Sequence, residues 1–316
     1  MAERFKRLAI LHSRRAAPGA RHHMVSLIAD DLAALGVEIV HLHGTSAYEP
    51  ADALLVHVDL SRVPKSVTRF AERYPRHINA GALDIRKQTF ADGLLKRGDT
   101  YDAPVIVKSD LNYGGVPEYL GLSLVERAWA KAGRLVVPGP SIRILTKEDY
   151  RIFPRLADVP KGYFGRGNIV QKMLYERAGE KFVLREYLFL GNLHYENIEH
   201  SDTQIISEDQ HISCMPFTPH PRLIEMRRKL SLDYGKIDYV MVDGAPFIFD
   251  ANKTMGLGEK IGTDGFGDGL RQMLRAFSGE IRRVLMNSEE GFSLPAPQSG
   301  ATQPASLSAQ SHRRAP

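Results

Sequence analysis

YGKIDYVMVDGAPFIFDANKTM, from Tyr234 to Met255, is the most informative stretch of this chain. Lys236 to Val242 alternates β-branched and aromatic residues with others, as a half-buried strand does. Asp243-Gly244 is a dipeptide strongly preferred in two-residue hairpin turns, and Pro246 to Asn252 reads as the returning strand. We therefore predict a β-hairpin.

Three oxygen-bearing side chains are expected to meet on one face of this hairpin. Residues two apart on a strand point to the same face, so Asp250 and Asn252 aim together. Asp238 lies on the partner strand, far from the turn, and the hairpin folds it back to about their level. Carboxylate and amide oxygens suit Mg²⁺, with Mn²⁺ as a substitute, so we predict a metal site. Asp250-Ala-Asn252 taken alone fits equally well a strand end that runs into a turn.

Composition bounds the class of protein. The chain has 316 residues, of which 43% are hydrophobic and 25% charged, values typical of a globular protein with two or three lobes. No apolar run is long enough for a membrane span or a secretory signal, so we expect a cytoplasmic protein without a membrane partner. The single cysteine, Cys214, excludes an internal disulfide and a multi-cysteine zinc site. A net charge of +5 suits anionic ligands such as nucleotides, and we predict no nucleic-acid partner.

The N-terminal part alternates strands and helices, which predicts a small open α/β sheet with parallel strands. The expected strands are 7–11, 37–42, 53–58 and 77–79, and the expected helices are 22–35 and 64–74. No GxGxxG follows the first strand, so a dinucleotide site of the usual kind is not predicted.

Polar residues stand where these strands end: His12 and Ser13, His43, Asp59 and Asn79. Ligands of open α/β sheets bind beyond the carboxyl ends of strands, so some of these side chains are candidates for substrate contact. Loop and cap chemistry is the alternative. No histidine pair has a metal-binding spacing such as HExxH, which argues against a histidine metal site here.

A phosphate cradle is predicted further along. Asp84 to Leu95 reads as a helix, and Ala103 to Lys108 is an apolar strand that ends in a lysine. The loop that follows, SDLNYGGV, contains Gly114 and Gly115, whose backbone N–H groups can approach an anion beside the lysine charge. The P-loop pattern GxxxxGK[ST] is absent.

The rest of the chain predicts further strands and helices. The strands are 134–137 and 169–174, a hairpin follows at 179–191 and 193–198, and the helices are 123–132, 219–232 and 270–286. Lys181, Val183 and Arg185 share one strand face, where the two charges either bind a ligand or face solvent. Residues beyond about Glu290 are rich in Ser, Pro, Gln and Ala and are predicted to be disordered.

Taken in order, these segments resemble the ATP-grasp superfamily, in particular glutathione synthetase and the ribosomal-protein glutamate ligases. The resemblance covers roughly residues 78–256. It implies an α/β N-terminal domain followed by two α+β lobes of ATP-grasp type that hold ATP between them. The implied domains are 1–82 for the N-terminal unit, 83–288 for the ATP-grasp unit and 289–316 for a disordered tail.

The resemblance also assigns roles. It implies a catalytic role for Arg185 and a metal role for Asp238, Asp250 and Asn252. For ATP it implies phosphate contacts from Lys87, Lys108, Asn112, Gly114 and Gly115, adenine contacts from a hinge at Gln171, Lys172 and Leu174, and a ribose contact from Glu176 or Glu180. Three features depart from the family: Asp250 stands where glutamate is usual, Gln171-Lys172 replaces an acid, and residues 116–168 cannot be aligned.

The activity implied is that of an ATP- and Mg²⁺-dependent ligase. In the family, a carboxylate is phosphorylated to an acylphosphate, which an amine or thiol then attacks. The expected partners are a small-molecule or peptide carboxylate and an amine acceptor, and a homo-oligomer is compatible with the sequence. Two alternatives stay open: a non-catalytic ATP-binding module, and an ATP-grasp kinase that phosphorylates without ligation.

Overall fold

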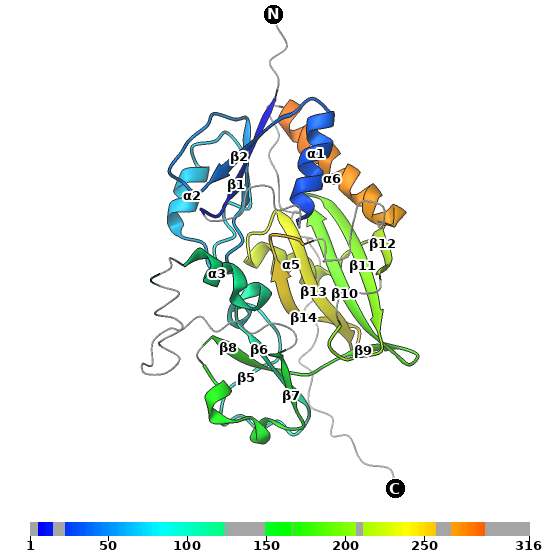
Figure 1. The fold of residues 1–316 in the computed structure, drawn as a ribbon. Helices are drawn as coiled ribbons and strands as arrows, with labels where there is room; N and C mark the ends of the chain where they lie inside the picture. Colours follow the sequence, from blue (N-terminus) through cyan, green and yellow to red (C-terminus); the bar gives the residue numbers. More distant parts are fainter. Residues whose placement is uncertain are drawn as a thin grey trace, which may run out of the picture.

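The computed structural model describes residues 6–14, 23–122, 125, 149–165, 167–206, 211–256 and 267–287. Three β-sheets succeed one another along the molecule, with helices against the first two, so the chain is a mixed α/β protein (Figure 1). None of the helices in these ranges is both long and apolar enough to cross a membrane. The predicted tail from residue 289, the strand 134–137 and, apart from Val125, the helix 123–132 lie outside the described residues.

The N-terminal sheet is parallel, as predicted. Its strands are β1 (Arg7–His12), β2 (Glu38–His43), β3 (Ala53–His57) and β4 (His77–Ile78), in the order β2-β1-β3-β4. Helix α1 (Met24–Ala34) packs on one face of the sheet and α2 (Lys65–Ala71) on the other. Leu8 and Ile10 belong to the first core and Ala9 and Leu11 to the second, which explains why β1 is apolar on both faces.

The predicted hairpin is confirmed as β13 (Tyr234–Val242) and β14 (Ala245–Asn252). Asp243 and Gly244 have φ of 50° and 80°, which is the left-handed pair that a tight type I′ turn requires. Asp238 pairs directly with Asp250, but Tyr239 pairs with Ile248, so Phe249 is the extra residue of a β-bulge. The bulge lies next to the predicted metal ligands.

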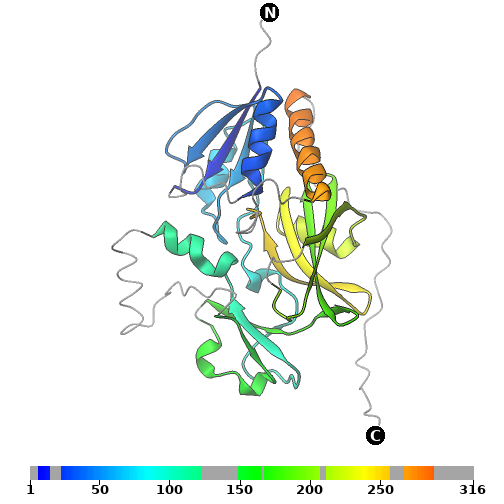
Figure 2. The same ribbon diagram turned by 45° about the vertical axis from the view of Figure 1, so that its right-hand side comes forward.

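The hairpin belongs to a long antiparallel sheet at the centre of the molecule. The strand order is β12 (His211–Pro216), β11 (Leu193–Ser201), β10 (Lys181–Leu190), β13 and β14, with β9 (Glu176–Ala178) paired to β10. Helix α5 (Pro221–Lys229) covers one face through Leu223 and Ile224. On the other face, α6 (Asp268–Met286) packs beside α1, so one apolar core joins this sheet to the N-terminal sheet (Figure 2).

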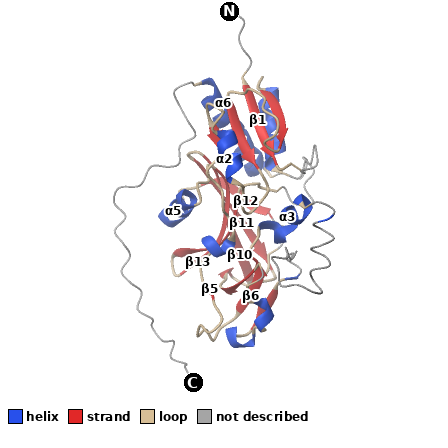
Figure 3. Cartoon of the chain, turned by 90° about the vertical axis from the view of Figure 1, so that its left-hand side faces the viewer, coloured by secondary structure: helices blue, strands red, loops and turns tan. Residues whose placement is uncertain are grey.

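The third sheet is small and antiparallel and lies at the opposite end from the N-terminal sheet (Figure 3). Its order is β5 (Leu94–Leu95), β8 (Asn168–Lys172), β6 (Val105–Ser109) and β7 (Arg151–Phe153). The segments around it are α3 (Val116–Gly121) and the 3₁₀ turns η1 (Lys87–Thr89), η2 (Asn112–Gly115), η4 (Leu156–Asp158) and η5 (Lys161–Tyr163). Strand β6 is buried throughout, as its apolar sequence predicts.

The helix predicted from Asp84 to Leu95 is wrong, because only η1 and β5 form there. Side-chain carboxylates accept hydrogen bonds from backbone N–H groups of this segment, in place of the carbonyl groups of a helix. The Gln88 N–H donates to Asp110 Oδ1 over 2.7 Å, and the Arg86 N–H donates to Asp84 Oδ1 over 3.1 Å. Asp110 is distant in sequence, so tertiary contacts override the local helical pattern.

Gly235 is required where the hairpin begins. Its φ is +156°, and a Cβ there would lie 2.3 Å from the Asn252 carbonyl oxygen. We expect Gly235→Ala to lower the free energy of unfolding by about 2–3 kcal/mol, because backbone must move on both strands. Gly279 lies at an exposed position of helix α6, where a Cβ would meet nothing within 4 Å. Gly279→Ala should therefore raise stability, by roughly 0.5–1 kcal/mol. Urea denaturation of both variants measures the contrast, and equal effects would contradict the steric argument.

Candidate functional site

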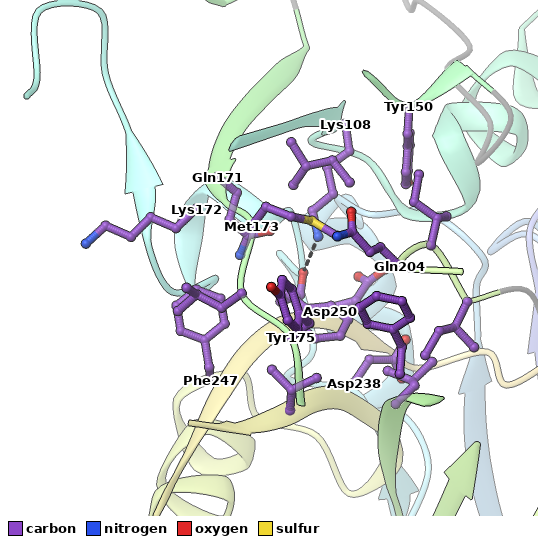
Figure 4. A pocket seen from close by; sticks show the side chains of 18 of the residues that line it. Lys108, Tyr150, Gln171, Lys172, Met173, Tyr175, Gln204, Asp238, Phe247 and Asp250 are labelled. Atoms are coloured by element: carbon purple, nitrogen blue, oxygen red, sulfur yellow. Dashed lines mark hydrogen bonds between the residues drawn. The ribbon is translucent and has the colours of Figure 1, made fainter. Parts of the chain in front are cut away.

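A pocket lies between the small sheet and the central hairpin. It encloses about 850 Å³ of space free of protein atoms, the open solvent at its mouth included. Strands β6 and β8 and the segment after β8 form one wall, and β10, β13 and β14 form the other (Figure 4). The residues that line it include Ile106, Lys108, Gln171, Lys172, Met173, Leu174, Phe182, Asp238, Val240, Phe247, Phe249 and Asp250. Apolar walls with a few charged groups at one end suit a molecule with an apolar ring and an anionic part.

The predicted hinge at Gln171, Lys172 and Leu174 lines this pocket. Two of its residues are held from outside: Gln171 Nε2 donates to the Asp92 carbonyl oxygen over 2.7 Å, and the Lys172 N–H donates to that of Gly93 over 2.9 Å. The Lys172 ammonium is directed away from the pocket and lies 4.9 Å from the Tyr101 ring centroid. Gln171 and Lys172, which stand where the family has an acid, therefore contact neighbouring parts of the chain. The hinge that contains them still lines the pocket.

Two buried lysines from separate segments converge on Asp250. Lys87 Nζ, from η1, lies 3.0 Å from Asp250 Oδ1, and Lys108 Nζ, from β6, donates to the Phe249 carbonyl oxygen over 3.2 Å. The β-bulge makes that carbonyl available, because Phe249 has no partner in the β13 register. Lysine side chains are rarely buried without an anion to neutralise them, so this end of the pocket is suited to phosphate.

The pKa values of the two lysines are shifted in opposite directions, with that of Lys87 raised and that of Lys108 lowered. Burial lowers the pKa of Lys87, but the Asp250 carboxylate, together with Tyr150 and Asp238, more than offsets burial and leaves that pKa above its ordinary value. Burial lowers the pKa of Lys108 to about 7, because the attraction of Asp250 is opposed by the charge of Lys87. Lys87 is thus a permanent cation that contacts Asp250 from outside the pocket lining, and Lys108, which lines the pocket, gains its proton most readily when a further anion arrives.

The predicted metal ligands are brought together in part. Asp238 and Asp250 are directly paired across the hairpin and both line the pocket, as predicted. Asn252 Oδ1 accepts hydrogen bonds from the N–H and the hydroxyl of Thr254, over 2.9 and 3.1 Å, and Asn252 does not line the pocket. Among the described residues there is no group of three His, Cys, Asp or Glu side chains arranged for a metal. Asp238 and Asp250 fit a hard cation that takes its other ligands from water and phosphate.

The predicted glycine loop has a docking role. Asn112 is buried, with its Nδ2 donating to the Ala251 carbonyl oxygen over 3.1 Å and its backbone N–H donating to Ser61 Oγ over 2.8 Å. Gly114 and Gly115 follow with φ of 65° and 82°, a left-handed turn that glycine permits. Asn112 therefore fastens the loop to β14, and none of the three residues lines the pocket.

The structure places the Arg185 side chain on the face of the sheet opposite to Asp238, and its catalytic role stays a prediction. Glu186, not Arg185, pairs directly with Asp238 and so shares its face. Arg185 Nη2 lies 2.7 Å from Glu176 Oε1, and its Nη1 lies 3.2 Å from Glu196 Oε1. Two carboxylates on that face therefore hold the guanidinium away from the pocket.

The ribose contact predicted for Glu176 or Glu180 also stays a prediction, and the structure places both residues outside the pocket lining. Both Glu176 oxygens are engaged by Arg185, and Oε2 also accepts from the Met241 N–H over 2.8 Å. Glu180 is exposed in the turn between β9 and β10. Neither glutamate lines the pocket.

Sequence reasoning missed Lys236 and Glu186, which lie on the same face of the sheet as Asp238. Lys236 forms an ion pair with the Glu186 carboxylate, and its Nζ lies 3.4 Å from Asp238 Oδ1. Asn197 Nδ2 also donates to Glu186 Oε2, over 2.8 Å. The two-residue spacing from Lys236 to Asp238 was a usable signal, whereas Glu186 emerges only from the pairing of β10 with β13.

We expect Arg185→Met to weaken ATP binding no more than about twofold, since the guanidinium does not reach the pocket. Stability should fall, because Glu176 and Glu196 lose the cation between them. Calorimetric titration with ATP and urea denaturation measure the two effects. A loss of ATP affinity comparable to that of Lys108→Met would contradict the placement of Arg185.

The comparisons with known proteins find similarity in structure alone. Neither the scan against protein-family models nor the search of curated proteins finds a match. A ligase from Chryseobacterium gregarium associated with RiPP peptides, solved with ADP and a leader and core peptide, is 8% identical over 88% of this chain and 97% of its own, with a TM-score of 0.48. The ATP-grasp ligase PsnB, solved with a minimal precursor, is 10% identical over 87% of this chain and 99% of its own, with a TM-score of 0.47.

Solved structures that this chain resembles include ATP-grasp ligases. A third example is the D-alanine–D-alanine ligase of Bacillus anthracis, 12% identical over 88% of this chain and 99% of its own, with a TM-score of 0.41. These likenesses are too distant to assign any residue a role. The function of the chain has to be inferred from its own side chains.

Proposed function

We propose that this chain is an ATP- and Mg²⁺-dependent ligase that joins a carboxylate to an amine, or to a thiol, through an acylphosphate. The observation that carries the proposal is the convergence of Lys87 and Lys108 on Asp250, directly opposite Asp238, at the charged end of an apolar pocket. Two lysines and two carboxylates at one point provide for the phosphates of a nucleotide and for the cation that accompanies them.

Each part of ATP has a proposed place. The adenine ring lies between the hinge, Gln171 to Leu174, and the apolar side chains of the hairpin, such as Phe247. The phosphates lie toward Lys87 and Lys108, and Asp238 and Asp250 hold Mg²⁺, with Asn252 retained as a proposed third ligand. Bound Mg²⁺ would neutralise charge on the phosphate oxygens. In this proposal, residues 83–288 form the two lobes that hold the nucleotide.

The proposed reaction has two steps. A carboxylate oxygen of the first substrate forms a bond to the γ-phosphorus, the bond from that phosphorus to the bridging oxygen breaks, and ADP leaves. The nitrogen of the amine then attacks the acyl carbon, phosphate leaves with the C–O bond electrons, and the nitrogen loses a proton. Lys108 and Lys87 would stabilise charge on the phosphate during transfer, which is electrostatic catalysis by preorganised cations.

The partners proposed are a small-molecule or peptide carboxylate and an amine acceptor. The proposal includes no nucleic-acid or membrane partner and is compatible with a homo-oligomer. The net charge of +5 accords with anionic substrates.

A non-catalytic ATP-binding module is the second candidate, and one observation favours it. Arg185, the cation that the family resemblance assigns to catalysis, is neutralised by Glu176 and Glu196 outside the pocket. A protein without that cation could bind ATP for sensing or assembly. A kinase that releases a stable phosphorylated product is the third candidate.

The discriminating experiment is a screen of ADP release against pooled carboxylic acids, with and without pooled amines. ADP release that requires both pools supports the ligase, and release with acids or other acceptors alone, with a stable phosphorylated product, supports the kinase. ATP binding without turnover in any pool supports the binding module. Absence of ATP binding by calorimetry, with Mg²⁺ or Mn²⁺ present, would overturn all three.

A further inference from the structure

Five histidines gather on one face of the N-terminal sheet. His12 pairs with His43 on β2 and with His57 on β3, so the three side chains stand in a row across neighbouring strands. His41 lies two residues before His43 and therefore on the same face. His23, the residue before α1, approaches from above, with its ring centroid 5.0 Å from that of His57.

Ring nitrogens meet at the centre of this histidine cluster. His12 Nε2 and His41 Nδ1 are 2.9 Å apart in a hydrogen bond, and the two ring centroids are 5.2 Å apart. The His43 ring centroid lies 5.3 Å from that of His12. A tetrahedral cation about 2.0–2.1 Å from each ligating nitrogen holds imidazole centroids roughly 5.2 Å apart, which matches the His12–His41 and His12–His43 separations.

His57 lies beside them with unmet hydrogen-bonding capacity. Its exposure is 3%, and neither ring nitrogen has a hydrogen-bond partner among the residues that the structure describes. His23 Nδ1 is also buried, and it also lacks a hydrogen-bond partner among the described residues. Buried polar atoms normally have partners, so unpartnered nitrogens beside a histidine pair indicate a ligand site.

We propose that this histidine cluster binds one borderline transition-metal cation of the Zn²⁺ class, with His12, His41 and His43 as its ligands and His57 beneath them. The cation takes the place of the hydrogen bond between His12 and His41, and the proton of that bond moves to the other nitrogen of its ring. The site is separate from the nucleotide pocket and does not depend on the ligase proposal.

Coordination requires a change in side-chain conformation. Within the described ranges no three His, Cys, Asp or Glu side chains are arranged to hold a metal ion. At this cluster His12 and His41 direct their facing nitrogens at each other. The rings must therefore turn about their side-chain bonds, from strand positions that already hold His12 and His43 side by side.

The ligand type selects the class of cation. Metal ligation requires neutral imidazole. Imidazole prefers Zn²⁺, Co²⁺, Ni²⁺ and Cu²⁺ over Mg²⁺, which distinguishes this site from the carboxylate pair in the pocket.

The test is a titration of the full-length, untagged protein with Co²⁺, with Mg²⁺ in excess to occupy the carboxylate pair of the pocket. We expect one equivalent to bind and to give the visible absorption of cobalt in a tetrahedral nitrogen site. His41→Gln and His43→Gln should each weaken binding by at least about 100-fold, because even changes around metal ligands cost roughly 10–100-fold.

The matched control is His77→Gln, which replaces an exposed histidine of the same sheet at the opposite end of a strand. It should leave Co²⁺ binding unchanged. His41 is exposed, so His41→Gln should fold, and circular dichroism checks this. The proposal is overturned by absence of stoichiometric binding, by equal affinity in the histidine-cluster variants and the wild type, or by displacement of Co²⁺ by excess Mg²⁺.

Discussion

Asp250→Asn is expected to reduce turnover by at least roughly 10²–10³-fold and to destabilise the fold at the same time. The Asp250 carboxylate is one of the three predicted cation ligands, and its Oδ1 lies 3.0 Å from Lys87 Nζ. Lys87 is 1% exposed, so removing its partner leaves a buried ammonium uncompensated. Breaking such a pair costs about 3–5 kcal/mol, and the partial exposure of Asp250 places the loss toward the lower value.

ADP release and urea denaturation measure the two effects, and a double variant separates them. Lys87→Met with Asp250→Asn removes both charges, so stability should partly recover while turnover stays lost. Asp243→Asn removes a carboxylate at the turn of the same hairpin, where φ is 50° and asparagine is well accommodated, and should change neither quantity. Turnover near the wild-type rate in Asp250→Asn would refute the cation and phosphate assignment.

Lys108→Met is expected to weaken ATP binding far more than adenosine binding, by at least about 100-fold. The side chain reaches the pocket from a buried strand, and only its ammonium faces the phosphate end. Charge-assisted hydrogen bonds to a buried ammonium contribute about 1.5–3 kcal/mol each. Equal loss for both ligands would show that Lys108 serves the fold and not the phosphates.

The pH dependence of ATP affinity gives a second measurement of Lys108. With a pKa of about 7, the amine loses its proton in the free protein as pH rises from 7.5 to 9, whereas bound phosphate favours the protonated form. The ATP dissociation constant should therefore increase over this range, by up to about tenfold per pH unit, where ATP itself no longer titrates. Lys108→Met should flatten this dependence, and adenosine binding should show none.

The lowered pKa of Lys108 also predicts how the free energy of unfolding changes with pH. The folded-state pKa of Lys108, about 7, lies below the ordinary lysine value of 10.5, so the unfolded chain binds more protons between these values. The free energy of unfolding contributed by Lys108 therefore rises with pH through this window and is lost as pH falls toward 7. Lys253, with a pKa lowered by burial to about 7, acts in the same direction, so the effect of Lys108 is the difference between wild type and Lys108→Met.

Local chemistry was enough to predict the hairpin and the carboxylate pair. The turn at Asp243-Gly244 and the alternation of the flanking strands set which residues oppose each other, so Asp238 and Asp250 could be paired without a structure. The parallel N-terminal sheet followed in the same way from its alternating strands and helices. These features depend on neighbours in the sequence.

Contacts distant in sequence decided the rest. Alternation along β10 shows that Arg185 and Glu186 point to opposite faces, but only the pairing of β10 with β13 shows that Glu186 shares the face of Asp238. The helix expected at Asp84 failed because Asp110, more than twenty residues away, takes up the Gln88 N–H. Strand register and competing hydrogen-bond partners are properties of the folded chain, and periodicity within one segment does not contain them.

The histidines illustrate the same division. His41 and His43 are recognisable in the sequence as neighbours on one strand face. Their meeting with His12 and His57 depends on the strand order β2-β1-β3, which aligns the carboxyl ends of three strands that lie far apart along the chain. Apolar burial on both faces of that sheet fixes its register, and the register places the four imidazoles together.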